Sequence, residues 1–410
     1  MLLILAGVTI SLLLDENGII KKSKDARREY GTSKTNEQEQ MDNANDWIEE
    51  ATAEPTPKVN VNTKAGENST INGKKGNANN PTIPAGYIPI NTETSNWGNE
   101  KDAPSQDSVN HGLVIKDEKN NEWVWVPVPD VTVMCDTSNT TEYTLCGTTG
   151  DTAVKTKLYS KSGIISGKTR ITPGTSSNYR EPDLVVGSDG AKYDAKDTYY
   201  KTILGDTGTK EQLAQLFVED YKEMIESIQK YGGFYIGRYE LSEAGVQKDK
   251  TTLTSTNWYN LYNACINSNL QASNKVKTQM IWGSQWDVAC NFIANKGDKK
   301  DITNSSTWGN YSDSTENAKV IVTEDDGTTT NKYGSEQNTG YSEYWKANNI
   351  YDLAGNCFEW TQEASYTGSR AYRGGNSACD GSSISVSYRN NVNPAAAATP
   401  NGTRPTLIIK

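Results

Sequence analysis

The stretch Asn349–Trp360 reads NIYDLAGNCFEW and is the densest run of structural signals in this 410-residue chain. Asp352, Gly355 and Asn356 predict a turn, because glycine tolerates positive φ and Asp and Asn side chains bond to nearby backbone groups. The aromatic and aliphatic residues between them predict buried anchors, namely Tyr351, Leu353, Phe358 and Trp360. The stretch therefore indicates a tightly turned, folded scaffold.

The composition of the whole chain indicates that part of it is solvated spacer. Apolar residues make up 34% and the mean hydropathy is −0.72, both low for a compact globule. Tryptophan (10) and tyrosine (22) are plentiful while phenylalanine (4) is scarce, which suits aromatic side chains that keep a polar edge in water. The net charge is −10, whereas nucleic acids and anionic lipid surfaces attract cationic proteins, so we expect neither as a partner of this chain's surface.

Residues 1–31 combine an apolar and a charged segment. Met1–Leu14 is continuously apolar, and as a helix it would reach about 21 Å, short of the roughly 30 Å hydrocarbon layer of a membrane. The charged stretch DENGIIKKSKDARREY follows. This succession resembles the N-terminal helix of type IV pilin-like proteins, in which a prepilin peptidase cleaves a longer apolar segment behind a short basic leader.

The leader and the first half of that apolar segment are absent here, so we expect the gene to start upstream. The resemblance implies contact with a membrane through this helix, and with pilus subunits. The alternative is a degenerate membrane anchor. Either interpretation places the rest of the chain outside the membrane.

Two further regions follow. Residues 32–110 are rich in Asn, Thr, Gly, Lys, Glu and Pro and bury too little to offset their ordering entropy, so we predict a low-complexity spacer. Residues 111–410 are predicted to form one domain. Within it, residues 130–208 are rich in Thr, Ser, Gly and Lys and are expected to be an insertion.

Four elements are predicted inside this domain. Residues 112–129 (GLVIKDEKNNEWVWVPVP) predict a hairpin whose second strand is buried on both faces. Thr209 and Gln212 form a capping box that opens a helix, which Gly232 and Gly233 end. Its apolar stripe consists of Leu213, Leu216, Phe217, Tyr221, Met224, Ile225 and Ile228. FYIGRYE follows as a strand, and a second helix is expected from Ser284, carrying Trp286, Cys290 and Ile293.

Several motifs occur together in a fixed order. They are WVWVPVP, GGFYIGRYE, SQWDVACNFI, GYSEYWKANNIYDLAGNCFEW, YRGGN, SVSYRN and GTRPTLIIK. This series resembles the formylglycine-generating-enzyme family, also called the sulfatase-modifying-factor type, over residues 112–410. The resemblance implies an α+β fold of the C-type-lectin-like class, with few helices and short twisted strands. Phe358 stands where the family pattern has a tryptophan.

The same resemblance implies a metal site. In enzymes of the family the glutamate that corresponds to Glu359 helps to bind calcium together with nearby carbonyl groups. Glu359 and the carbonyls of Gly355 and Cys357 would supply the hard oxygen ligands that Ca²⁺ prefers. The alternative is that Glu359, which lies between two aromatic residues, forms a salt bridge to Arg373 or Arg389, because an unpaired carboxylate there would be costly.

The thiols argue against catalysis. The family uses a pair of cysteines behind an R-G-G segment, and Cys379 falls where the first would lie, but Ile384 holds the position of the second. Paired thiolates bind the copper and handle the substrate in that chemistry, so we predict no enzyme. Cys379 is catalytic only if the oxidase interpretation holds; otherwise it is a surface residue or a partner of Cys357.

The remaining cysteines and the single histidine carry no catalytic pattern. The six cysteines follow no C-x-x-C spacing, which argues against structural zinc. Cys135 and Cys146 could close a loop, as in an exported protein, or all six could be free thiols. His111 stands in a polar stretch without a partner spacing, so we expect it to be a loop residue.

Residues 366–393 alternate scaffold-like Arg and Gly with Tyr, Ser, Asn, Thr and Asp, the residue types of adaptable recognition surfaces. This pattern, with Arg404 and Pro405 behind it, resembles the variable proteins of diversity-generating retroelements. The resemblance implies that residues 366–393 are a variable region. The contact residues expected there are Tyr366, Tyr372, Asn376, Asp380, Tyr388, Asn390 and Asn393.

The sequence therefore predicts a ligand-binding protein at the cell surface, anchored in a membrane or a pilus, whose partner is a protein or a glycan. No nucleic-acid partner is expected. Two alternatives stay open. One is a formylglycine-generating oxidase of protein cysteine, and the other is a structural pilin subunit.

Overall fold

A computed structural model describes residues 68–70, 76–90, 109–161, 163–165, 168–170, 179–185, 199–324, 326–365, 368–397 and 400–410. The predicted helix of residues 1–31 and most of the predicted spacer lie outside these ranges. Within the described ranges, no helix is both long and apolar enough to span a membrane.

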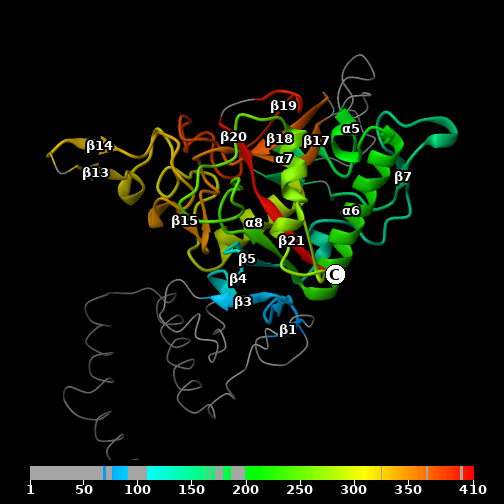
Figure 1. The fold of residues 1–410 in the computed structure, drawn as a ribbon, viewed down its shortest axis with the longest axis horizontal. Coiled ribbons are helices and arrows are strands. Elements are labelled where there is room, and N and C mark those ends of the chain that lie inside the picture. Colours follow the sequence, from blue (N-terminus) through cyan, green and yellow to red (C-terminus); the bar gives the residue numbers. More distant parts are fainter. Residues whose placement is uncertain are drawn as a thin grey trace, which may run out of the picture. The chain divides into compact units, whose positions relative to one another are not determined.

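A six-stranded antiparallel sheet forms the centre of the domain (Figure 1). The predicted hairpin of residues 112–129 is confirmed as its strands β4 and β5. The sequence from Trp123 to Val126 is fully buried, as expected for a strand covered on both faces. In spatial order the strands are β12 (Val276–Met280), β21 (Pro405–Ile409), β11 (Gly233–Gly237), β5 (Glu122–Pro127), β4 (Val114–Asp117) and β3 (Tyr87–Ile90).

Residues 32–110, predicted to be a spacer, include the edge strand β3. β3 pairs with β4 in the central sheet, and β2 (Thr82–Ile83) pairs with β1 (Ser69–Thr70). The Tyr87 side chain is 1% exposed and its hydroxyl accepts a hydrogen bond from Ala272 N at 3.1 Å. A few well-spaced apolar residues thus suffice for a strand when an existing sheet edge offers the backbone partners.

The helices lie against this sheet. α6 (Lys210–Tyr231) begins and ends as predicted: Thr209 and Gln212 form the capping box, and Gly232 adopts a left-handed conformation with φ 81°. α8 (Gly283–Asn295) is also confirmed, but starts one residue earlier than expected. The backbone N–H groups of Gly283 and Ser284 donate to the buried carboxylate of Glu181. That acceptor comes from a distant segment, which explains the shifted start.

Two more helices were not predicted. They are α7 (Trp258–Cys265), capped by the Asn257 side chain, and the short α5 (Tyr199–Leu204). α6 packs against β11 and β21, α7 against β12, and α8 against β5. The domain is therefore a mixed α/β fold with few helices and curled antiparallel sheets.

A second sheet carries the predicted variable region. Its order is β19 (Arg389–Val392), β18 (Ser369–Arg373), β17 (Phe358–Ser365), β10 (Tyr179–Arg180), β9 (Lys168–Arg170) and β8 (Gly163–Ile165), with β20 (Asn401–Thr403) also paired to β17. β8, β9 and β10 come from the predicted insertion, so that segment extends the sheet. The β17–β20 and β9–β10 pairs are parallel, whereas the others are antiparallel.

Three small hairpins complete the described strands. They are β6 (Tyr143–Thr144) with β7 (Lys155–Thr156), β13 (Ile321–Thr323) with β14 (Thr329–Asn331), and β15 (Lys346–Ala347) with β16 (Ile350–Tyr351). The β13–β14 hairpin projects from the rest of the domain (Figure 1).

The cap of α6 provides a test of this fold. Thr209→Ala removes the side-chain acceptor for Gln212 N and should lower the free energy of unfolding by about 1 kcal/mol. Urea unfolding followed by circular dichroism measures this. Thr207→Ala, at an exposed position two residues earlier, should leave the midpoint unchanged. Equal effects of the two variants would contradict the cap.

Candidate functional site

The carboxylate of Glu359 is engaged by Arg404. The Arg404 Nε lies 3.2 and 3.1 Å from the two Glu359 oxygens, and its Nη2 lies 2.7 Å from Oε1. Both side chains are fully buried. The guanidinium also donates to the carbonyls of Gly237 (2.9 Å) and Tyr351 (2.8 Å). One cation therefore links β17 of the second sheet with β11 of the central sheet and with the NIYDLAGNCFEW turn.

This partner corrects the expectation that Glu359 pairs with Arg373 or Arg389. The strand register does place Glu359 beside Arg373, but the Arg373 guanidinium turns to Asp287, with Nη1 2.9 Å from Oδ1. Arg404 is distant from Glu359 in the sequence and reaches it only because β20 pairs with β17. No local spacing signals such a contact.

Two more buried carboxyl groups belong to the same cluster. Glu240 accepts hydrogen bonds from Thr252 Oγ1 (2.6 Å), Asn356 Nδ2 (2.7 Å) and Cys357 N (3.2 Å). Asp352 Oδ2 accepts from Gly340 N at 2.6 Å, while its Oδ1 has no hydrogen-bond partner. We call Glu240, Asp352, Glu359 and Arg404 the carboxyl cluster.

The carboxyl cluster holds more acids than its single cation can balance. Burial raises the pKa of Glu240 well above its usual range, and the nearby Asp352 and Glu359 raise it further. Burial also raises the pKa of Glu359, against the influence of Arg404. The pKa of Asp352 is raised by burial to about 7. Burial therefore favours the protonated form of these acids in the folded state.

Glu359, one of the predicted calcium ligands, is engaged by a cation of the protein itself. Both Glu359 oxygens accept from a guanidinium, and a cation in their place would lie beside that positive charge. Among the described residues, no group of three or more His, Cys, Asp or Glu is arranged to hold a metal ion. Calcium binding by Glu359, Gly355 and Cys357 stays a prediction.

A second charged network lies behind β18 and β19. Arg389 Nη2 is 2.7 Å from Asp287 Oδ2, and its Nε is 2.8 Å from Glu363 Oε2. Arg373 shares Asp287 and also donates to the carbonyls of Tyr388 (2.8 Å) and Ser387 (3.1 Å). All four charged residues are buried. Ion pairs of this kind fix the positions of β18 and β19 relative to α8 and β17.

The opposite face of these strands carries aromatic and amide side chains. Trp360, Tyr372 and Asn390 are cross-strand partners, so they lie on one face of the sheet. Phe358 and Tyr388 join them, each two residues before a member of that row. The Phe358 and Tyr372 rings meet edge to face, with centroids 4.6 Å apart. Asn390 Nδ2 donates to the Tyr388 hydroxyl at 2.9 Å.

We call Phe358, Tyr372, Tyr388 and Asn390 the aromatic face. All four side chains are half-buried, so each offers part of its surface to solvent while its position is fixed by neighbours. Phe358 was predicted only as an anchor; its place on this face could have been found from its spacing to Trp360. The structure thus brings together Tyr372, Tyr388 and Asn390 of the predicted contact residues.

The other predicted contact residues lie elsewhere. Asn376 is 8% exposed and its side-chain oxygen accepts from Ala378 N, so it shapes a turn. Asp380 is exposed and accepts a hydrogen bond from Ser312 Oγ at 3.0 Å. Asn393 is half-buried and accepts from Ala395 N at 2.8 Å. Tyr366 lies outside the described residues.

The loop between β18 and β19 is shaped by Tyr311, which the sequence patterns did not single out. Its hydroxyl donates to Gly374 O at 2.5 Å. A Cβ on Gly375 would lie 2.7 Å from the Tyr311 ring, and one on Gly381 only 2.5 Å from it. Gly374 and Gly375 also have positive φ angles of 87° and 75°. Glycine is therefore required where the loop wraps around this ring.

All six cysteines lie in the described residues and all are free. Neither the pair Cys135 and Cys146 nor the pair Cys357 and Cys379 forms a disulfide. Cys379 is half-buried, and burial raises the pKa of its thiol, which disfavours the reactive thiolate. His111 lies in a turn, with its Nδ1 3.7 Å from Asp298 Oδ1.

Comparisons with known proteins give one distant likeness. No profile of a protein family matches the chain, and no curated protein matches it. Among solved structures, Treponema denticola variable protein 1 is similar to it with a TM-score of 0.27 and 13% sequence identity. The match covers 44% of this chain and 85% of that one. A likeness at this level does not assign the fold.

The Arg404–Glu359 pair can be tested by a mutant cycle. Arg404→Leu leaves a buried carboxylate unpaired and should cost about 3–5 kcal/mol of unfolding free energy, measured by urea denaturation. The double variant Arg404→Leu/Glu359→Leu should recover much of that loss. Lys222→Leu, which removes an exposed ion pair to Glu226, serves as the control. A double variant that is less stable than Arg404→Leu alone would rule out this pairing.

Asp352 provides a test by pH. Its pKa rises from 3.8 to about 7 on folding, so between these values the folded state keeps a proton that the unfolded state has released. Stability from this residue therefore falls as pH rises through that window. Asp352→Asn should gain stability relative to wild type from pH 4 to pH 7, in urea midpoints measured at each pH. Asp326→Asn, at an exposed position, should not show this gain.

Proposed function

We propose that this chain is a ligand-binding protein and that the aromatic face is its recognition surface, carried on a domain of the C-type-lectin-like class. Partly exposed tyrosine, phenylalanine and asparagine side chains on a fixed support carry this proposal. Tyr372 and Tyr388 offer large amphipathic surfaces at little cost in side-chain entropy, and Asn390 offers both a donor and an acceptor. A protein or a glycan is the expected ligand.

The support behind the aromatic face favours recognition over a purely structural role. Arg373 and Arg389 bind Asp287 and Glu363, which holds the two strands at their places while the residues in front can differ. A surface whose scaffold does not depend on its contact side chains can exchange those side chains without unfolding. This arrangement is the one that a diversified binding region requires.

The thiol chemistry weighs against the oxidase alternative. Cys379 has a raised pKa and a free, half-buried thiol, and its expected catalytic partner position is Ile384. The other alternative, a pilin subunit, rests on residues outside the described ranges. From the resemblance of residues 1–31 to a pilin-like helix, we propose that the protein is displayed at the cell surface or on a pilus. The cellular location of the full-length gene product tests this.

Within this proposal, the burial of the side chains supports variation at only some positions of residues 366–393. Gly374, Gly375 and Arg389 are buried in the support, so an exchange of the whole segment would unfold the domain. The positions open to exchange are those with exposed or half-buried side chains, including Tyr372, Asp380, Tyr388 and Asn390. Gene sequences from many isolates should show substitutions at these codons and constancy at the glycines; even scatter would exclude diversification.

A binding test uses a glycan array and a panel of extracellular proteins as probes. The variant Tyr372→Ala/Tyr388→Ala should lose at least about tenfold in affinity for any probe that the wild type binds, because aromatic anchors dominate such interfaces. Tyr344→Ala, which removes a tyrosine that is 55% exposed and lies elsewhere, is the matched control. Equal binding by both variants, with unchanged melting temperatures, would refute the aromatic face as the recognition surface.

A further inference from the structure

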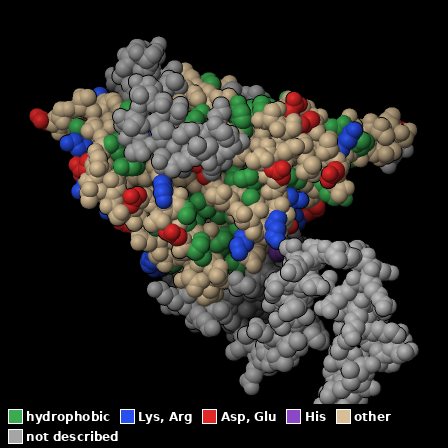
Figure 2. Space-filling model, turned by 180° about the vertical axis from the view of Figure 1, so that it is seen from behind, with side chains coloured by type: hydrophobic (Ala, Val, Ile, Leu, Met, Phe, Trp, Pro, Cys, Tyr) green, Lys and Arg blue, Asp and Glu red, His purple; other side chains and the backbone are tan. Residues whose placement is uncertain are grey.

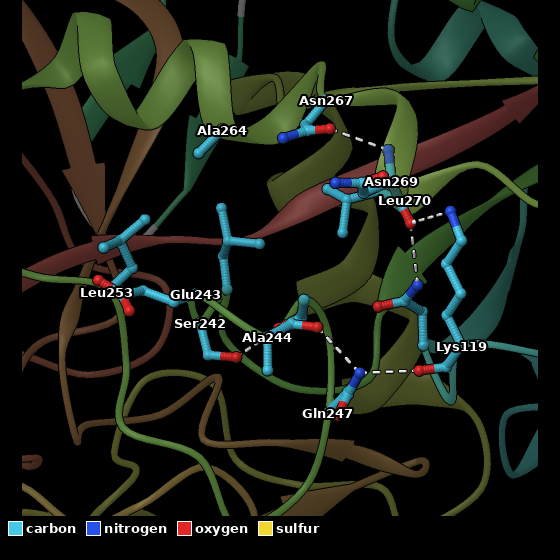
Figure 3. Close-up of a pocket in the computed structure, with 13 residues that line it drawn as sticks. Lys119, Ser242, Glu243, Ala244, Gln247, Leu253, Ala264, Asn267, Asn269 and Leu270 are labelled. Carbon is cyan, nitrogen blue, oxygen red and sulfur yellow. Dashed lines mark hydrogen bonds between the residues drawn. The ribbon is translucent and has the colours of Figure 1, made fainter.

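A groove lies beside the loop that follows β11, at residues that the sequence patterns do not single out. It consists of two hollows of about 350 Å³ and about 500 Å³. Both hollows are lined by Ser242–Ala244 and by Leu253, so they adjoin across this short segment. Figure 3 shows the first hollow, with Lys119 and Gln247 on one side and Asn267 at another.

The walls of the groove are tied to one another. Asn121 accepts a hydrogen bond from Val246 N at 3.0 Å, and it donates to the carbonyl of Asn269 at 3.4 Å. Gln247 Nε2 bridges the carbonyls of Lys119 (2.8 Å) and Ala244 (2.9 Å). Three segments that are far apart in the sequence are thus held together before any ligand arrives, which lowers the entropic cost of binding.

The charges along the groove alternate in sign. Lys119 lines only the first hollow, Lys250 lines only the second, and Glu243 lines both. The order along the groove is therefore positive, negative, positive. Within the described part of the chain, neither Glu243 nor Lys250 forms an ion pair. Lys119 Nζ donates to the carbonyl of Asn269 at 3.2 Å, which leaves two of its N–H groups for a ligand.

The uncharged lining is a mixture of amides and small apolar groups. Asn267 and Asn269 are exposed at the rim of the first hollow, and a side-chain amide can pair with a peptide group as donor and acceptor. Leu241 and Leu270 lie in the first hollow, with Leu253 in both. Among the described residues that line the two hollows there is no aromatic side chain.

We propose that this groove binds an extended peptide segment whose side chains alternate acidic, basic and acidic on one face. In an extended chain every second side chain points the same way, so the sequence acidic-x-basic-x-acidic presents three charges to Lys119, Glu243 and Lys250. A nucleic acid carries one sign of charge along its length and would be repelled at Glu243. This site is separate from the aromatic face in the residues that form it.

Two labelled peptides test the proposal on the full chain by fluorescence anisotropy. The first is Gly-Glu-Ser-Lys-Ser-Glu-Gly, blocked at both ends, and the second is its charge-reversed form, Gly-Lys-Ser-Glu-Ser-Lys-Gly. At low salt the first should bind about tenfold more tightly, the sum of a few exposed ion pairs. About 1 M salt should abolish the difference, because screening then acts within about 3 Å.

A charge reversal in the protein completes the test. A third peptide of equal length, in which the lysine is replaced by glutamate, is all-acidic, and the wild type should prefer the first peptide to it. Glu243→Lys makes the groove uniformly positive and should remove this preference. Glu226→Lys, at an exposed position of α6, should retain the wild-type preference. Equal binding of both peptides to the wild type, or the same effect from both variants, overturns the proposal. Binding of a neutral oligosaccharide such as maltohexaose, with neither peptide bound, overturns it as well.

Discussion

The fully buried guanidinium of Arg404 holds the two sheets of this domain together. It bonds to a carboxylate on β17, to a carbonyl at the end of β11 and to the Tyr351 carbonyl in the NIYDLAGNCFEW turn. Without the guanidinium the buried carboxylate of Glu359 would lose its ion pair, and the two carbonyls would each lose a donor. Since β20 carries Arg404 into place through its parallel pairing with β17, that pairing is part of the same constraint.

Buried arginine–carboxylate pairs also lie behind the aromatic face, where they connect one helix with two strands. Arg373 and Arg389 share the carboxylate of Asp287, so α8, β18 and β19 are connected through charged groups rather than through apolar packing alone. Buried ion pairs require definite geometry, and they give little tolerance for shifts of register. The charged side chains of β18 and β19 are buried on one face of the strands, and the aromatic and amide side chains lie on the other face. On the face in Figure 2, described residues of both charge signs are interspersed.

Local patterns predicted the elements that local physics forms. The capping box of Thr209, the apolar stripe of α6 and the doubly buried strand at Trp123–Val126 depend on neighbours in sequence, and all were found. β3 and the partner of Glu359 depend on residues far away in the chain, so no spacing revealed them. Of the aromatic face, Tyr372, Tyr388 and Asn390 were among the predicted contact residues, because their residue types are those of adaptable recognition surfaces. Asn376 was expected to contact a ligand, but its side chain is buried in a turn of its own loop, which residue type alone does not predict.

The position of β21 in the central sheet has a consequence for biosynthesis. β21 lies between β12 and β11, yet it is translated after every other strand of that sheet. Until it arrives, β12 has no strand partner in the sheet, and one edge of β11 is open. Such edges can pair with other chains. The nascent protein therefore has a vulnerable interval during translation, which ends when β21 pairs with β11 and β12.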